Sequence, residues 1–250
     1  EQELRYLANY DTLTGLPNRT LLGERLGHAI IRARRTARKV AVLFLDLDRF
    51  KHVNDSMGHA AGDRMLKAAG ARLRATVREA DTVARLGGDE FTVVLEDVQD
   101  SAEAASVARK LLEAFTVPLE LDSSQEVVIS PSIGVALYPD HGMVPTDLLK
   151  FADTAMYQAK ERGRNTFMVY TPEMDAAARR RAVMIAALRR ALDRNELHLV
   201  FQPKQTLADG RITGVEALLR RTSEELGSIP PSVFIPLAEE AGQIVEIGEY

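Results

Sequence analysis

Two apolar, β-prone runs meet at a Gly-Gly turn between residues 84 and 95, which read ARLGGDEFTVVL. Glycines supply the positive φ angles of a tight hairpin, so this stretch predicts a β-hairpin with Gly87 and Gly88 at its turn. Asp89 and Glu90 follow directly, at a sheet rim where hard cations bind and a bulky anion can approach the bare backbone. Taken alone, such a sequence is more often a surface turn without a binding function, so the rest of the chain is needed to distinguish the two interpretations.

The composition limits the class of protein. The chain has 250 residues, of which 46% are hydrophobic and 27% charged, which is typical of one large or two medium globular domains. The net charge of −4 argues against nucleic acid as a partner, and the arginine clusters at 32–35 and 179–181 are typical of solvated helix faces. The lack of cysteine excludes disulfides, thiolate metal sites and cysteine nucleophiles.

The sequence also bears on localisation. No apolar run approaches the ~18 residues of a membrane span, and no signal peptide is recognisable. We therefore expect a cytoplasmic domain, with membrane anchoring through an upstream segment left open. The chain begins at Glu1 rather than Met, and we expect it to be part of a longer protein.

The order of strand and helix signals predicts an α/β (α+β) domain. Residues 39–47 are a continuous apolar run, typical of a strand buried on both faces. The other predicted strands are residues 81–86, 91–97, 127–137 and 167–170. The predicted helices are residues 20–37, 63–79, 101–115, with Ser101 as N-cap, and 146–163. This β-α-β-β-α-β order is ferredoxin-like with extra elements, and right-handed crossovers place the first strand beside the hairpin.

Carboxylates cluster where this topology brings the first strand to the hairpin turn. Asp46 and Asp48 are two residues apart and would share one strand face. Asp46 would then face Asp89 and Glu90 across a small gap. Three carboxylates repel one another unless a cation lies between them, and Mg²⁺ held by few carboxylates usually completes its shell with phosphate oxygens and water. The pattern predicts a nucleoside triphosphate site.

Five motifs in the right order resemble the GGDEF family of diguanylate cyclases, which condense two GTP into cyclic di-GMP. The motifs span residues 11–19 (DTLTGLPNR, against DxLTxLxNR), 46–63, 87–91, 132–135 and 152–165. The resemblance covers residues 11–170. It implies a phosphoryl transfer in which the 3′-hydroxyl of one GTP attacks the α-phosphorus of the other and pyrophosphate leaves.

The resemblance also implies residue roles. Asp89 and Glu90 would be catalytic, Glu90 assisting the metal or the 3′-hydroxyl, and Mg²⁺ or Mn²⁺ would be held by Asp46, Asp89 and the carbonyl of Leu47. The implied GTP-binding set is Lys51, Asn54, His59, Asp63, Lys160 and Arg164. Asn54 and Asp63 would bind guanine, because a carboxylate accepts from N1–H and N2–H donors that adenine lacks. Lys51, Lys160 and Arg164 would contact phosphates, although Lys160 and Arg164 alone also fit a solvated helix face.

Each domain of this family holds one GTP, so catalysis would need a homodimer, and residues 1–10 would be a helix arriving from an upstream sensory domain. The RxxD motif at Arg78 and Asp81 is separated from Gly87 by five residues and matches the family's inhibitory site for the product cyclic di-GMP. Arg109 would supply a further cation there, from the same or a neighbouring chain. The alternative is a surface ion pair, worth about 0–1 kcal/mol.

The end of the chain differs in type. Residues 171–195 predict a connecting helix, and residues 197–202 and 212–219 predict a strand pair around Asp209-Gly210. Residues 196–250 resemble the start of an EAL domain, the family of cyclic di-GMP phosphodiesterases, with Glu216 as first metal ligand and Gln202 and Arg220 near the ligand. Arg221 stands where that family usually has an aromatic residue. This TIM-like barrel would be incomplete here, so we expect no phosphodiesterase activity from this chain.

Three interpretations of function follow. The leading one is an active diguanylate cyclase attached to the start of a phosphodiesterase. The second is a regulatory module that binds GTP and activates the phosphodiesterase. The third is a cyclic di-GMP receptor that acts through the product site.

Overall fold

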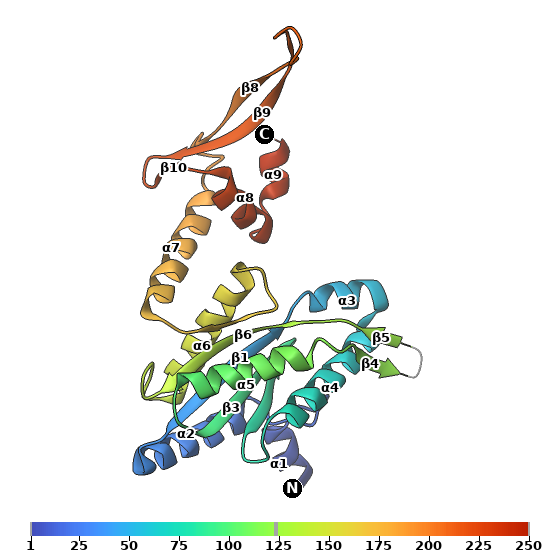
Figure 1. Cartoon of the computed structure of the whole chain (residues 1–250), viewed down its shortest axis with the longest axis vertical. Coiled ribbons are helices and arrows are strands. Elements are labelled where there is room, and N and C mark those ends of the chain that lie inside the picture. The colour runs from blue at the N-terminus through green and yellow to red at the C-terminus, as the bar shows by residue number, and fades with distance from the viewer. Residues whose placement is uncertain (1, 123–124, 250) are drawn as a thin grey trace. The chain divides into compact units, whose positions relative to one another are not determined.

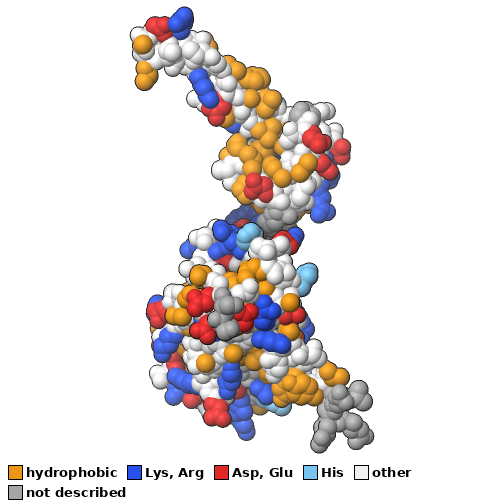
Figure 2. Space-filling model, turned by 90° about the vertical axis from the view of Figure 1, so that its right-hand side faces the viewer, with side chains coloured by type: hydrophobic (Ala, Val, Ile, Leu, Met, Phe, Trp, Pro, Cys, Tyr) orange, Lys and Arg blue, Asp and Glu red, His pale blue; other side chains and the backbone are white. Residues whose placement is uncertain are grey.

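The computed structural model describes residues 2–122 and 125–249. The chain divides into two compact units, the first ending at Asp175 and the second beginning at Ala176, and each is considered by itself (Figure 1). Within the described residues, no helix is both long and apolar enough to cross a bilayer. Acidic and basic side chains are interspersed over the face that Figure 2 shows, rather than gathered by sign.

The first unit is built on a five-stranded sheet with the order β2-β3-β1-β6-β7. Its strands are β1 (Lys39–Leu47), β2 (Thr82–Gly87), β3 (Glu90–Val98), β6 (Pro131–Tyr138) and β7 (Phe167–Val169). β1 is antiparallel to both β3 and β6, whereas β7 runs parallel to β6. The predicted ferredoxin-like arrangement, with the first strand in the middle of the sheet beside the hairpin, is confirmed.

Helices cover both faces of this sheet (Figure 1). Leu43 and Leu45 of β1 belong to a core with α4 (His59–Thr76) and α5 (Ser101–Ala114), and the alternating Val42 and Phe44 belong to a second core with α2 (Arg19–Thr36) and α6 (Pro145–Glu161). β1 is therefore buried on both faces, as its continuous apolar sequence predicts.

Several boundaries differ from the sequence-based expectation. The helix expected at residues 63–79 begins earlier, at His59, and is preceded by the short α3 (Phe50–Met57). The N-cap of α5 is Asp100 rather than Ser101, because the Asp100 carboxylate accepts a hydrogen bond from the Glu103 N–H at 2.9 Å.

The strand expected at residues 127–137 is divided. β5 (Gln125–Val127) pairs with β4 (Leu119–Asp122) in a separate two-stranded ribbon, and β6 begins only at Pro131. Proline has no N–H to donate to a ladder and is tolerated as the first residue of a strand. The α1 helix (Gln2–Asn9) precedes this unit's opening segment, residues 11–19.

The second unit holds a small mixed structure. α7 (Pro172–Leu188) crosses the boundary between the units and ends before residue 194, and turns follow it. β8 (Leu197–Gln205), β9 (Ile212–Ser223) and β10 (Gly227–Ile229) form a sheet in the order β10-β9-β8, followed by α8 (Pro231–Glu240) and α9 (Ile244–Glu249). The expected strand pair forms around a turn in which Gly210 has a φ of 70°.

Gly134 fixes how closely α6 packs on β6. A Cβ at this position would lie 1.9 Å from the Ala152 carbonyl oxygen and 2.1 Å from the Met156 nitrogen, which are backbone atoms that cannot move aside cheaply. We expect Gly134→Ala to lower the free energy of unfolding by about 3 kcal/mol, as overpacking does. Urea unfolding measures this loss.

Gly23→Ala is the matched control, because Gly23 lies inside α2 with no heavy atom within 4 Å of its would-be Cβ. Alanine is the better helix former, so this variant should gain about 0.5–1 kcal/mol. Equal unfolding curves for both variants would contradict the packing described for Gly134.

Candidate active site

The signature turn, residues 87–90, joins β2 to β3. Gly87 and Gly88 have φ angles of 146° and 50°, so both adopt conformations that side-chain-bearing residues rarely take. A Cβ at either position would meet no atom within 4 Å. The space in front of the turn is therefore open, and the glycines serve the backbone conformation and the approach of a ligand rather than internal packing.

Asp46 lies beside this turn at the end of β1. Its Cα pairs in register with that of Glu90 on β3, and its carboxylate forms an ion pair of 2.8 Å with the Lys160 ammonium on α6. Burial raises the pKa of Asp46 to about 6; the hydrogen bond from Lys160 lowers it, and the negative charge of Asp89 raises it further. A cation is needed here, and Lys160 supplies one.

Glu90 shares this electrostatic environment. Burial raises its pKa, and the charges of Asp153 and Asp89 add to the rise, against Arg19 and Lys160. Burial also raises the pKa of Asp153 itself. The sequence reasoning missed Asp153, although its position seven residues before Lys160 on one predicted helix placed both on the same face.

Asp48 does not join this group of carboxylates. It follows the last residue of β1, and its two oxygens accept hydrogen bonds from the Ser130 hydroxyl, the Ser132 hydroxyl and the Asn165 N–H at 2.7, 2.7 and 3.1 Å. Its own N–H donates to the Ser130 carbonyl at 2.8 Å. Asp48 is therefore an anchor between β1, β6 and the turn after α6.

The residues expected to hold a metal fit that task in their chemistry. The Leu47 N–H donates to the Asp89 carbonyl at 3.3 Å, which holds the signature turn beside the end of β1. Asp46, Asp89 and the Leu47 carbonyl offer hard oxygen donors of the kind Mg²⁺ prefers. However, among the described residues no three His, Cys, Asp or Glu side chains already form a metal-holding group, so the expected three-carboxylate gap is not preformed.

A buried arginine holds the signature turn in place. Arg85, 9% exposed, donates to both Asp11 oxygens at 3.0 and 2.9 Å and to the Gly88 carbonyl at 3.0 and 2.7 Å. Burial acts to raise the pKa of Asp11, but hydrogen bonds from Thr14 and Arg85 outweigh it, so the pKa is lowered. The sequence reasoning gave Arg85 no role, although an arginine inside an apolar strand is a signal for a buried ion pair.

The two residues expected to bind guanine lie on helices that pack together. Asn54, on α3, packs against α4, since a Cβ on Gly62 would lie 1.9 Å from the Asn54 Oδ1. Asp63 follows Gly62 directly and is exposed. Lys51 on α3 and His59, the first residue of α4, are also exposed.

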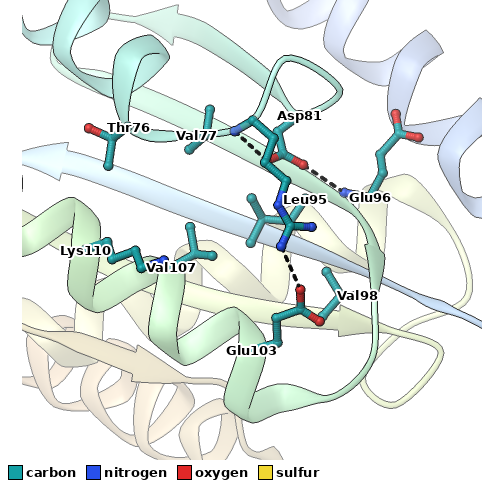
Figure 3. A pocket seen from close by; sticks show the side chains of 10 residues that line it. Thr76, Val77, Asp81, Leu95, Glu96, Val98, Glu103, Val107 and Lys110 are labelled. Atoms are coloured by element: carbon teal, nitrogen blue, oxygen red, sulfur yellow. Dashed lines mark hydrogen bonds and ion pairs between the residues drawn. The ribbon is translucent and has the colours of Figure 1, made fainter.

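The RxxD motif lies in a separate small pocket of about 80 Å³ (Figure 3). The Asp81 carboxylate accepts from the Arg78 N–H at 3.1 Å and the Glu96 N–H at 3.3 Å. Arg74, which the sequence reasoning missed, donates to the carbonyls of Arg78, Glu79 and Asp81 at 3.0, 3.0 and 2.9 Å. This loop is therefore held in one conformation without a ligand.

The other walls of this pocket come from α5. Glu103 forms an ion pair of 3.2 Å with the Arg78 guanidinium, and Lys110 lines the pocket on the same helix. Arg109 is not among the lining residues, because its guanidinium lies 6.0 Å from the centre of the Phe167 ring. Within this chain Lys110 lines the pocket from α5, and a cation from Arg109 of a neighbouring chain stays a prediction.

In the second unit, Gln202 and Glu216 lie directly opposite each other on β8 and β9. Glu216 forms an ion pair of 3.4 Å with Lys204, and the Arg220 guanidinium donates to the Leu219 carbonyl at 2.9 Å. The structure thus brings Gln202 and Glu216 together and leaves Arg220 on the neighbouring part of β9.

Arg221, the departure noted in the sequence, is 1% exposed. It donates to the Glu196 carboxylate at 3.2 and 3.0 Å, and Ser223 donates to the same carboxylate at 3.2 Å. A buried ion pair replaces the packing of an aromatic side chain at this position.

Comparisons with known proteins agree with this arrangement. A family model described as "Diguanylate cyclase, GGDEF domain" matches residues 8–166. The chain belongs to the GGDEF family. A model of the EAL domain matches residues 185–250, so the EAL region is partial. The GGDEF resemblance drawn from the five motifs, and the EAL resemblance after it, are both confirmed.

Longer relatives match this chain over its whole length. The bifunctional diguanylate cyclase/cyclic di-GMP phosphodiesterase MucR of Pseudomonas aeruginosa is 48% identical over 249 residues, which are 100% of this chain and 36% of MucR. The cyclic di-GMP phosphodiesterase PdeR of Escherichia coli is 42% identical over 250 residues, 100% of this chain and 37% of PdeR. The chain thus spans about a third of the length of these curated relatives.

A solved structure of the GGDEF domain of Pseudomonas aeruginosa TpbB matches with a TM-score of 0.66 and 41% identity, covering 68% of this chain and 99% of that one. TpbB is named a diguanylate cyclase, and its sequence is 44% identical over 163 residues, 65% of this chain and 38% of TpbB. The mixed α/β fold of the first unit is therefore that of the GGDEF domains.

We expect the Asp46 carboxyl to titrate near pH 6 in carbon-13 NMR spectra, because burial raises its pKa from 3.8 to about 6. Ionisation of Asp46 then opposes folding, and its contribution to stability falls as the pH rises from about 4 to about 6. Lys160→Met should raise the midpoint further, since Lys160 lowers this pKa. Lys51→Met is the control and should leave it unchanged.

The same titration tests metal binding without any turnover. Added Mg²⁺ should lower the midpoint, because a carboxylate must lose its proton to ligate a metal. A midpoint near 3.8 without metal, or one that millimolar Mg²⁺ does not move, would contradict this description of the site.

Proposed function

We propose that the first unit is a diguanylate cyclase that condenses two GTP into cyclic di-GMP and pyrophosphate. The observation that carries this proposal is the meeting of Asp46, Lys160 and the complete signature turn at one edge of the sheet. The similarity to TpbB, named a diguanylate cyclase, supports it.

In this reaction the 3′-oxygen of one GTP forms a bond to the α-phosphorus of the other. The bond from that phosphorus to the bridging oxygen breaks, and pyrophosphate leaves with the electron pair. Glu90, whose pKa is raised by burial, is suited to assist removal of the 3′-hydroxyl proton. Two such transfers close the ring of cyclic di-GMP.

Asp46, Asp89 and the Leu47 carbonyl would hold Mg²⁺ or Mn²⁺, which when bound neutralises charge that develops on the phosphates. Lys160 and Arg164, with Lys51, would orient the triphosphate, and catalysis would come mostly from this positioning. Each unit would bind one GTP, so two chains must face each other as a homodimer. In the whole protein, an upstream sensory domain would control that encounter through α1.

Guanine would be recognised by Asn54 and Asp63. Asn54 packs against Gly62, the residue before Asp63, and this packing holds α3 and α4 together where the two residues would bind the base. Product inhibition would act at the Arg78–Asp81 pocket, where cyclic di-GMP would displace the Glu103 carboxylate from Arg78.

A second candidate is a GTP-binding regulatory module of a cyclic di-GMP phosphodiesterase. The similarity to PdeR over the whole of this chain favours it, as does the start of an EAL domain in the second unit. In that case the first unit would bind GTP with little turnover. The EAL part in this chain is incomplete, and we expect no hydrolysis of cyclic di-GMP from it.

Incubation with GTP and Mg²⁺, with chromatography for cyclic di-GMP and an assay for pyrophosphate, distinguishes these candidates. We expect both products from the chain, and a loss of more than tenfold in rate for Asp89→Ala, because a lost metal ligand removes several kcal/mol of charge stabilisation. Asp147→Ala, an exposed residue in the first turn of α6, is the control. GTP binding without product would support the regulatory module, and an Asp89→Ala rate above a tenth of wild type would refute its metal role.

Base selectivity tests the guanine assignment. We expect Asp63→Ala to reduce the ratio of kcat/KM for GTP to that for ATP by about tenfold or more, because the N–H donors of guanine would then have no acceptor in the site. Lys67→Ala, one turn further along α4, should keep the preference. If Asp63→Ala discriminates as well as wild type, guanine is recognised elsewhere.

Product inhibition tests the RxxD pocket with two opposite variants. Arg78→Ala should raise the half-inhibitory concentration of cyclic di-GMP about tenfold or more, since a charge-assisted hydrogen bond is lost. Glu103→Gln should lower it, because Arg78 loses its competing carboxylate while the amide oxygen still accepts from the Gln99 N–H. Equal inhibition of both variants and wild type would reduce the motif to a surface ion pair.

A further inference from the structure

The first unit contains a cavity of about 480 Å³, and Arg164 is the one residue of the proposed GTP site that lines it. It lies between the start of α3, the end of α5, the segment before β6 and the turn between α6 and β7. Arg49 and His52 line it from α3, and Arg164 lines it from the turn after α6. Its size is within the usual range for small-ligand pockets.

These basic side chains have no counter-charge. Within residues 2–122 and 125–249, Arg49 and Arg164 form no ion pair, and the His52 imidazole has no hydrogen-bond partner. Many exposed arginines of this chain do find a carboxylate, as Arg194 does with Glu225. Unpaired cations that converge on one cavity leave a positive potential there, which an anion would relieve.

The one carboxylate that lines the cavity in the described structure cannot serve as that counter-charge. Asp48 already accepts hydrogen bonds from Ser130, Ser132 and the Asn165 N–H. These bonds hold the two segments that bear Arg49 and Arg164, because Asp48 directly precedes Arg49 and accepts from the N–H of Asn165, the residue after Arg164.

The backbone at both arginines is unusual. Arg49 has a φ of 61°, and Gly163, Arg164 and Asn165 have successive φ values of 110°, 64° and 47°. Left-handed conformations of residues with side chains are uncommon and persist only where the surroundings hold them, often at functional sites. The Arg164 N–H donates to the Ala159 carbonyl at 3.1 Å, which helps to hold this turn.

Apolar residues also line the cavity, among them Val53, Phe115 and Ile129. Apolar groups lower the local dielectric and so strengthen the attraction between the basic residues and an anion. The cavity therefore combines basic side chains with an apolar part of its lining.

We propose that this cavity is a binding site for inorganic pyrophosphate, the leaving group of the condensation. The inference rests on the proposed function, in which Arg164 also contacts the triphosphate of GTP. Arg164 would be common to both sites, and Arg49 and His52 would receive the anion after it leaves the α-phosphorus. Asn54, Asp63 and Asp46 do not line the cavity, so the guanine and metal parts of the proposed GTP site lie outside it. Arg164 is the residue that the two sites share.

Isothermal titration of the whole chain with sodium pyrophosphate, in buffer free of divalent metal, tests this site. We expect wild type to bind, and the double variant Arg49→Ala with His52→Ala to bind at least about tenfold more weakly. The affinity for 3′-deoxy-GTP, which cannot react, should change by less than about threefold, which also shows that the variant is folded. Arg162→Ala, in the same turn but outside the cavity lining, is the matched control and should bind both as wild type does.

Three results would overturn the inference. The first is that wild type does not bind pyrophosphate below about 10 mM. The second is that the double variant binds pyrophosphate as tightly as wild type does. The third is that the double variant loses affinity for pyrophosphate and for 3′-deoxy-GTP to the same extent. The measurement needs no turnover, so this inference can fail while the chain still makes cyclic di-GMP. The proposed function fails separately, if GTP and Mg²⁺ give no cyclic di-GMP.

Discussion

The buried guanidinium of Arg85 is the contact on which the candidate site most depends. It joins the Asp11 carboxylate of the opening segment to the Gly88 carbonyl of the signature turn, and the Arg85 N–H donates to the Pro17 carbonyl at 3.0 Å. Removing one partner of such a pair leaves a buried charge uncompensated, which is costly. The direction of Asp89 and Glu90 is thus fixed by residues that directly follow α1, so any movement of that helix bears on the carboxylates through a short chain of polar contacts.

The second constraint is the burial of the Asp46 carboxylate, which water solvates poorly. Asp46 lies one residue before the end of β1, which is buried on both faces. Its raised pKa shows that burial outweighs the effect of Lys160. The proposed reaction depends on this poor solvation of Asp46, because a cation binds a carboxylate most strongly where water solvates the charge poorly. Lys160 would then be released from Asp46 toward the triphosphate, which couples substrate binding to the charge of the metal site.

The sheet could be predicted from the sequence because strands and turns have local sequence patterns. The apolar run of β1, the Gly-Gly turn and the order of strands and helices predicted a first strand in the middle of the sheet beside the hairpin, as the structure has it. The contacts of Asp48 and the lining of the Arg78–Asp81 pocket have a different origin. The strand ends at Leu47, so Asp48 accepts from Ser130 and Ser132. The face of α5 that carries Ala104, Ala108 and Leu111 is buried, and within this chain Lys110 rather than Arg109 lines the pocket. Packing between distant segments decides both, and no local pattern encodes it.

The central claim is that two chains, each with one GTP, make cyclic di-GMP. The most direct measurement is the initial rate of cyclic di-GMP formation at saturating GTP and Mg²⁺ over a wide range of protein concentration. The account predicts that the rate per chain rises in proportion to concentration while the protein is mostly monomeric and then reaches a plateau as dimers form. A rate per chain that is constant for a protein shown to be monomeric by sedimentation, or no product at any concentration, would contradict it.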